Sequence, residues 1–146
     1  MRLHLNQEKT HVVQLEEGRT AVDFLGFTVR RAPSRLHAGR FTVITPSAKA
    51  VIRFQRRLTT ITGPKMCFRP TIDLVQDVNS RLRGWAGYFR YGYASSALRK
   101  IDRHALIRLQ QHLKRRSQRP YRPPQGVSWY QHLHENLGLI RIGAPV

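Results

Sequence analysis

Residues 80–93 read SRLRGWAGYFRYGY, and the pattern of this stretch decides how the chain folds. Leu82, Trp85 and Phe89 recur at spacings of three and four, which places them on one face of a helix. We predict that this face is buried, because an apolar stripe at helical spacing is core more often than a platform for bases. Arginines alternate with the aromatic residues, and each can bind a phosphate through two parallel hydrogen bonds. These arginines, which we expect to meet a partner, are Arg81, Arg83 and Arg90.

The same helix extends upstream of this stretch. Ile72, Val75 and Val78 continue the apolar stripe, and Thr71 can cap the helix at its start. Two glycines, Gly84 and Gly87, weaken it by roughly 1 kcal/mol each relative to alanine. We therefore expect another helix to approach closely at these two positions.

Two further long helices flank this one. For the first, the sequence predicts Thr45 as N-cap, Pro46 at the first helical position and an end at residues 63–64. Its apolar face is Val51, Phe54, Leu58 and Ile61. Ser95 or Ser96 caps the third helix, which ends before Pro120. Its inner face is Leu98, Ile101, Ala105, Leu109 and either His112 or Leu113. A proline-stiffened linker at 121–126 precedes a short helix at 129–137, capped by Ser128.

Strand patterns are confined to the first third of the chain. We predict strands at residues 11–15, 21–30 and 41–44, with a turn around Gly18 and a bulge at Gly26. A lone hairpin is marginal in water, so the sheet must pack on something else. The sequence therefore predicts an α+β fold, in which a small antiparallel β-sheet (a hairpin plus a third strand) precedes a three-helix bundle and a short C-terminal helix.

The charge of the chain is strongly positive. Twenty-six Lys and Arg face eight Asp and Glu, a net charge of +18, and residues 47–119 hold seventeen of the basic and three of the acidic side chains. Such a surplus repels itself in a compact fold, so we expect a polyanionic partner and a basic flank on the bundle. Nucleic acid ranks before an anionic membrane surface, because no apolar run approaches the roughly 20 residues that span a bilayer.

The cysteine, aspartate and histidine residues bear on the localisation of the protein and on whether it holds a catalytic or metal site. Cys67 is the one cysteine, which excludes an internal disulfide and a cysteine zinc site. With no signal peptide evident, we expect a cytoplasmic protein, in the bacterial nucleoid or cytoplasm or an organelle matrix. No two aspartates are adjacent, and Asp73 and Asp77 are interpreted as charges that favour the start of a helix. We predict no catalytic residue and no metal site, with all seven histidines in surface or packing roles.

Two motifs carry a resemblance to a known family. Residues 83–90, RGWAGYFR, resemble the RGWxxYxR signature of the maturase region (domain X, or thumb) of group II intron reverse transcriptases. Residues 23–27, DFLGF, are similar to the FLGF block that closes the palm of these enzymes, and residues 8–10, EKT, match the run ahead of that block. The motifs stand in the order of the family and at about its spacing.

The resemblance implies three regions. Residues 1–45 would be the last strands of a reverse-transcriptase palm, residues 46–119 the maturase-specific thumb, and residues 120–146 a linker with a short helix. The resemblance covers essentially the whole chain but only the C-terminal part of the family's protein. The paired aspartates of the polymerase are absent, so we expect no RNA-directed DNA polymerase activity from this chain alone. It implies no cofactor either, because Mg²⁺ would belong to that missing site.

The resemblance also implies site residues. Binding of intron RNA is expected from Lys49, Arg53, Arg56, Arg57, Arg81, Arg83, Arg90, Arg99, Lys100, Arg103, Arg108, Lys114, Arg115 and Arg116. A grip on a primer strand is expected from Phe24, Leu25, Gly26 and Phe27. Structural core roles are expected for Leu82, Trp85, Phe89, Ile101 and Leu109.

Four hypotheses remain open on these grounds. The chain is a truncated or split maturase that binds group II intron RNA to assist splicing. Alternatively, it is the C-terminal subunit or tail of a reverse transcriptase that an upstream polypeptide completes, with a DNA or RNA primer–template as partner. A third reading is a general basic nucleic-acid-binding protein, and a fourth is a remnant reading frame without an independent role.

Overall fold

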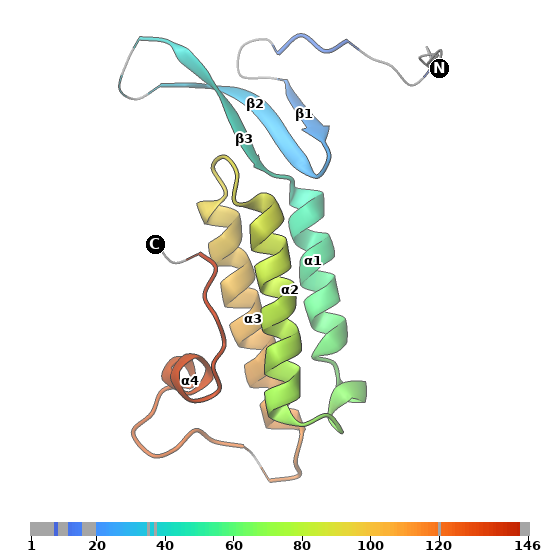
Figure 1. Ribbon diagram of the computed structural model, residues 1–146, viewed down its shortest axis with the longest axis vertical. Coiled ribbons are helices and arrows are strands. Elements are labelled where there is room, and N and C mark those ends of the chain that lie inside the picture. The colour runs from blue at the N-terminus through green and yellow to red at the C-terminus, as the bar shows by residue number, and fades with distance from the viewer. Residues whose placement is uncertain are drawn as a thin grey trace.

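The computed structural model describes residues 8, 12–15, 20–34, 36, 38–119 and 121–143. A three-stranded sheet lies at one end of a bundle of three long helices, and the C-terminal segment packs along the bundle (Figure 1). The strands are β1 (Ala21–Phe24), β2 (Phe27–Pro33) and β3 (Arg40–Pro46). The helices are α1 (Ala48–Ile61), η1 (Pro64–Met66), α2 (Thr71–Phe89), α3 (Ser95–Arg115), α4 (Trp129–Gln131) and η2 (His132–Asn136). The predicted α+β class is confirmed.

The hairpin differs from the prediction. The region expected to be one strand, 21–30, is β1, a two-residue turn and the start of β2, and residues 12–15 form no strand. Both turn residues have left-handed backbone, with φ of 49° at Leu25 and 83° at Gly26. That combination matches the twist of a tight hairpin, so the glycine makes a turn and not a bulge. Residues 9–11 and 16–19, which include part of the EKT run and the predicted turn around Gly18, lie outside the described residues.

Three helices begin at other residues than predicted. Thr45 and Pro46 belong to β3, and the N-cap of α1 is Ser47, whose hydroxyl accepts a hydrogen bond from the Ala50 amide at 3.2 Å. The N-caps of α2 and α3 are Pro70 and Ala94, without a side-chain cap. Only the predicted cap at Ser128 is present, in a reciprocal capping box with Gln131.

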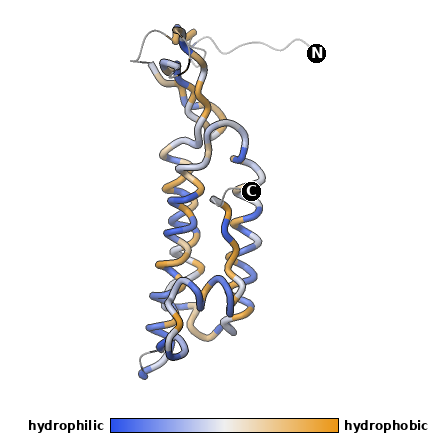
Figure 2. Tube along the Cα trace, turned by 90° about the vertical axis from the view of Figure 1, so that its left-hand side faces the viewer, coloured by the Kyte–Doolittle hydropathy of each residue, from blue (hydrophilic) through white to orange (hydrophobic). Residues whose placement is uncertain are grey.

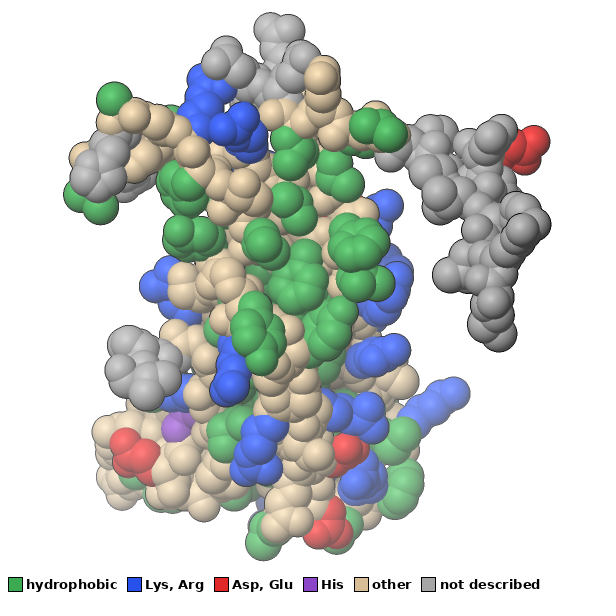
Figure 3. All heavy atoms as spheres, turned by 45° about the horizontal axis from the view of Figure 1, so that its top comes forward, with side chains coloured by type: hydrophobic (Ala, Val, Ile, Leu, Met, Phe, Trp, Pro, Cys, Tyr) green, Lys and Arg blue, Asp and Glu red, His purple; other side chains and the backbone are tan. Residues whose placement is uncertain are grey.

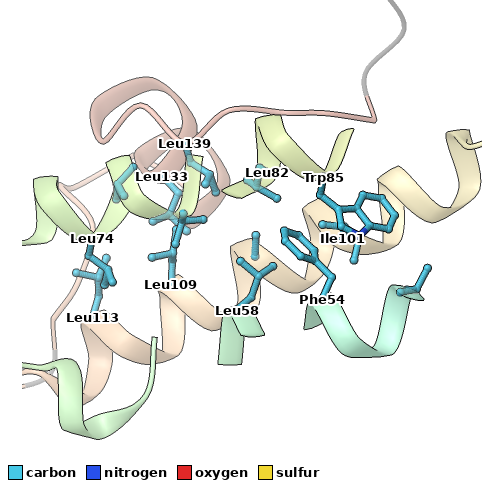
Figure 4. Close-up of a cluster of buried hydrophobic side chains, with 14 of the residues drawn as sticks. Phe54, Leu58, Leu74, Leu82, Trp85, Ile101, Leu109, Leu113, Leu133 and Leu139 are labelled. Atoms are coloured by element: carbon cyan, nitrogen blue, oxygen red, sulfur yellow. The ribbon is translucent and has the colours of Figure 1, made fainter. Parts of the chain in front are cut away.

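The core lies between the three long helices and the C-terminal segment. Phe54 and Leu58 from α1 meet the α2 and α3 stripes there, and Leu133 and Leu139 close the far side (Figure 4). The tube view shows hydrophobic and hydrophilic positions alternating along each helix, as one buried face per helix requires (Figure 2). The five residues expected in the core are all buried: Leu82, Trp85, Phe89, Ile101 and Leu109.

Two predictions about α2 are wrong. Ile72 is 64% exposed, whereas Leu74 is fully buried. The two side chains are about 200° apart around the helix, so only one of them can face inward. Gly84 and Gly87 are exposed, and a Cβ at either would meet nothing within 4 Å, so none of the described helices approaches them.

The loop between α2 and α3 joins the sheet to the bundle. Gly92 has a φ of +78°, and a Cβ there would lie 2.4 Å from the Ile44 carbonyl oxygen. The same carbonyl accepts a hydrogen bond from the Tyr93 amide at 2.8 Å. Only glycine permits this approach, so the chain reversal after α2 also fixes β3. Within the described part of the chain, none of the helices has the length and apolar character needed to cross a membrane.

Candidate nucleic-acid interface

A groove runs between α1 and α2, below the turn that joins β1 to β2. We define this α1–α2 groove by Arg53 and Arg57 on α1, Arg81 on α2 and the aromatic residues between them. Its main hollow has a volume of about 430 Å³. The two α1 arginines are exposed and four residues apart, so both stand on the same side of the helix.

The floor of the groove is aromatic. The rings of Phe54 and Trp85 stack with centroids 5.3 Å apart, and Trp85 and Phe89 lie 4.5 Å apart. All three side chains are buried in the core, so they form a rigid floor and do not extend into solvent. Figure 3 shows hydrophobic side chains gathered on the face below the sheet, with Lys and Arg side chains on both sides of them.

Tyr88 forms the upper rim of the groove. The residue is 51% exposed, its hydroxyl donates to the Leu25 carbonyl at 2.9 Å, and the ring of Phe27 stacks on its ring with centroids 5.6 Å apart. The residues predicted to grip a primer therefore end the groove at the hairpin turn. Phe24 and Leu25 are exposed there, Phe27 packs inward, and Gly26 lies against the ring of Phe89.

The carboxylate of Asp77 has a different role from the predicted one. Asp73 lies in the first turn of α2, but Asp77 forms ion pairs with Arg69 at 3.1 Å and Arg81 at 3.0 Å. The pair with Arg81 spans one helical turn and is half-exposed, so it orients the guanidinium more than it stabilises the fold. Arg81 is thereby held at the edge of the groove.

The outer face of α1 extends the basic surface beyond the groove. Lys49 and Arg56 join Arg53 and Arg57 around a shallow hollow of about 520 Å³. Of the remaining predicted residues, Arg83 and Arg90 are exposed on or just after α2, and Arg90 lies 6.0 Å from the ring of Tyr91.

The predicted basic residues of α3 lie elsewhere. Arg99, Lys100 and Arg103 are exposed near its start. Near its end, Lys114 lies 5.4 Å above the ring of Trp129, Arg115 donates to the side chain of Gln111, and Arg116 donates to the hydroxyl of Thr71. The expected single basic flank is therefore wrong. Each helix turns a different stripe to the shared core, so their polar faces point in different directions.

Arg108 is the predicted RNA-binding residue that the fold itself uses. Its guanidinium donates to the hydroxyl of Thr62 and the carbonyl of Thr59, both at 3.3 Å, and to Gln111 at 2.9 Å. Burial, and then the charge of Arg115, lower the pKa of Arg108. This side chain joins α3 to the end of α1.

Sequence reasoning missed Tyr88 and Gly84 as groove residues. Both lie next to residues of the buried stripe, and the signal that could have found them is an exposed aromatic beside a glycine on one helix face. In the part of the chain that the structure describes, no group of three or more His, Cys, Asp or Glu could hold a metal ion. Cys67 is a free, half-buried thiol.

A comparison with known protein families agrees with the resemblance carried by residues 83–90. The sequence pattern of the family described as group II intron, maturase-specific domain, matches residues 51–132, which is more than half of the chain. The matched range includes α2, α3, α4 and all but the first residues of α1. A search of the curated proteins finds no match to the chain.

Proposed function

Because the chain belongs to the family of group II intron maturase-specific domains, we propose that it binds the folded RNA of a group II intron and assists its splicing. The observation that supports this most is the α1–α2 groove, in which three arginines surround a rigid aromatic floor. Arginine binds phosphate in a fixed geometry, and the exposed ring of Tyr88 at the rim can accept the face of an unpaired base. The groove thus suits an RNA strand with phosphates at its rim.

The mode of recognition in this proposal is by shape and charge. Proteins recognise RNA helices chiefly through phosphates and 2′-hydroxyl groups, because the deep groove is too narrow for side chains. Guanidinium groups on α1 and α2 lower the repulsion between RNA strands that must pack closely in a folded intron. The groove residues given this role are Arg53, Arg57, Arg81 and Tyr88.

Binding, and not nucleotide transfer, is the proposed activity of this chain. Two-metal polymerases need clustered carboxylates that hold ions about 4 Å apart. The 146 residues contain no adjacent aspartates, and Asp77 is engaged by two arginines.

A competition experiment tests the proposal. A labelled transcript of a complete group II intron is bound to the full chain at fixed salt, and an unlabelled unrelated RNA duplex of equal length competes. We expect the intron to be preferred, and R53Q/R57Q to bind it about tenfold less tightly with a salt dependence reduced by about two phosphate contacts. The matched control K65Q/R122Q removes two exposed charges outside the groove and should bind as the wild type does. Equal affinity for the intron and the duplex would favour a general nucleic-acid-binding protein.

A second candidate function rests on the sheet. Within the described residues β1 pairs with β2 alone, and Phe24 and Leu25 are exposed beside it. An unpaired strand edge is a template for another strand. On this hypothesis the chain completes a reverse transcriptase whose palm lies on another polypeptide. Primer extension on an RNA template, with and without a palm-and-fingers polypeptide, tests it; no activity from any combination would exclude it.

A further inference from the structure

The C-terminal segment forms a strap over α2 and α3. This C-terminal strap, residues 137–143, follows η2 and turns at Gly138, which has a φ of +74°. The amide side chain of Asn79 on α2 donates to the Gly138 carbonyl at 2.8 Å and accepts from the Ile140 amide at 3.0 Å. Leu139 is buried in the common core. The strap is therefore a fixed part of the bundle.

Asp102 on α3 fixes the end of the strap. Its carboxylate accepts hydrogen bonds from the Ile142 amide at 3.0 and 3.1 Å and from the Gly143 amide at 2.7 Å. A Cβ at Gly143 would lie 2.7 Å from the Arg99 amide nitrogen, so the strap backbone touches the backbone of α3. These contacts bring Arg141 of the strap next to the exposed arginines near the start of α3.

A pocket of about 480 Å³ lies between α3 and the strap. Among its lining residues are Arg99 and Arg103 from α3 and Arg141 from the strap, so three guanidinium groups face one carboxylate, that of Asp102. Both oxygens of this carboxylate accept hydrogen bonds from the strap amides. Within its described lining the pocket carries a net positive charge, because three guanidinium groups outnumber one carboxylate.

One wall of the pocket is an aromatic ring. Tyr130 on α4 is 45% exposed, and the guanidinium carbon of Arg141 lies 5.7 Å from the centre of its ring. The imidazole of His134 supports the ring at 4.5 Å, and its Nδ1 donates to the Leu139 carbonyl at 2.7 Å. The ring is thus held in place, and nearly half of the residue remains exposed.

We propose that this α3–strap pocket is a second RNA-binding site, which takes one unpaired nucleotide with its base on Tyr130 and its phosphates on Arg103 and Arg141. The inference rests on the proposed function and deepens it. The volume of the pocket falls in the range of about 300–1,000 Å³ that is typical of small-ligand pockets, and such a volume suits one nucleotide. An acidic peptide could also pair with guanidinium groups, but the exposed ring beside them favours a base.

The pocket and the α1–α2 groove are separate sites. They share no lining residue, and the strap lies on the side of the bundle away from α1 (Figure 1). Arg141 and His134 also lie beyond the matched residues 51–132. A chain that binds RNA on two sides holds two segments of one intron together, and the second contact forms at a high effective concentration.

The test compares two pairs of arginines on the full chain. R103Q/R141Q removes the pocket charges, R53Q/R57Q removes those of the groove, and K65Q/R122Q is the matched control. Each protein is titrated with a short labelled oligouridylate, and each is used for hydroxyl-radical footprinting on a complete group II intron transcript. We expect R103Q/R141Q to bind oligouridylate about tenfold less tightly. On the intron, this variant should no longer protect one set of nucleotides from hydroxyl radicals, and it should still protect the set that R53Q/R57Q leaves unprotected.

A substitution of the ring adds a readout independent of charge. Y130F should bind oligouridylate as the wild type does, and Y130L should bind it several-fold less tightly, because only an aromatic ring stacks on a base. Circular dichroism checks that each variant is folded. The inference is overturned if R103Q/R141Q keeps every protection, if the two arginine pairs lose the same protections, or if oligoglutamate displaces oligouridylate from the pocket at equal charge concentration. If the wild-type chain did not prefer the intron over the unrelated duplex, but the substitutions in the pocket still weakened oligouridylate binding, only the proposed function would be overturned.

Discussion

The Nδ1 atom of His112 lies 3.1 Å from the carbonyl oxygen of Thr62, and this hydrogen bond joins the buried side of α3 to the end of α1. It is one of three such contacts at intervals of one helical turn. His104 donates to the Gln55 carbonyl at 3.1 Å, and Arg108 donates to Thr59 and Thr62. The last carbonyls of a helix lack partners within it, so α3 satisfies those of Thr59 and Thr62 with its side chains.

Protonation of His112 should destabilise the fold. Burial lowers its pKa most, the bond to Thr62 opposes this, and the charges of Arg116, Arg115 and Arg108 lower it further. Burial also lowers the pKa of His104. Because the unfolded chain then binds more protons than the folded one, the free energy of unfolding should fall as the pH drops below about 6.5, the usual pKa of histidine, and level off above it.

Urea unfolding between pH 5.5 and 8 measures this dependence. H104Q/H112Q removes both titrating groups, so its stability should vary much less over this range. H112Q alone should retain the part due to His104. A wild-type protein that becomes more stable on acidification from pH 7 to pH 5.5 would contradict the assignment of neutral, buried imidazoles.

The face that α2 buries can be tested by two alanine substitutions. Leu74→Ala removes a fully buried side chain and should lower the free energy of unfolding by about 2–5 kcal/mol. Ile72→Ala removes one that is mostly exposed and should change it by less than about 0.5 kcal/mol. Chemical denaturation of both variants gives the comparison. Equal losses would mean that the helix is rotated from the position described.

The sequence predicts those parts of the fold that depend on residues close together in the chain, and not those that depend on residues far apart. The stripe from Val75 to Phe89 could be predicted, because helix periodicity is local. Ile72 could not, since both it and Leu74 suit the first turn, and only contacts with α3 and the strap decide between them. The prediction of the hairpin was wrong for a similar reason. Gly26 alone interrupts the strand pattern, and a bulge and a turn leave nearly the same pattern in the sequence.

The candidate site was predicted in composition but not in arrangement. The sequence shows which residues are basic, and all of the predicted ones except Arg108 are exposed on the surface. It does not show that Arg108 would be bound by α1, or that Arg141 would lie beside Arg103. Both depend on contacts between residues about 40 or more positions apart, which only the packed bundle determines.

The attachment of the strap should depend on Asn79. Asn79→Ala removes two part-buried hydrogen bonds to the strap backbone, which together should cost about 1–3 kcal/mol. We expect the Ile140 amide to exchange its hydrogen faster, while amides in the middle of α3 remain protected. Hydrogen exchange measured by NMR resolves the two regions, and Gln76→Ala, an exposed change on the same helix, is the control. Unchanged exchange at Ile140 would mean that Leu139 and Asp102 hold the strap without Asn79.

Substitutions at the two exposed glycines of α2 test protein stability and RNA binding separately. Gly84 and Gly87 lie inside a helix with open space where a Cβ would be, so alanine at either should stabilise the protein by about 0.5–1 kcal/mol. Thermal unfolding of Gly84→Ala and Gly87→Ala checks this. A loss of stability in either would show that the open space is filled.

Larger side chains at the same positions should differ in RNA binding. Gly84 lines the α1–α2 groove beside Arg57 and Arg81, whereas Gly87 does not line it. Gly84→Leu should therefore weaken intron RNA binding several-fold by occupying the space between the arginines, because the phosphates could no longer approach both at once. Gly87→Leu places the same larger side chain on α2 outside the groove, and this variant should bind intron RNA as the wild type does. If both variants, each shown to be folded, bound RNA equally well, the strand could not lie in the groove, and the arginines of α1 would have to act from its outer face.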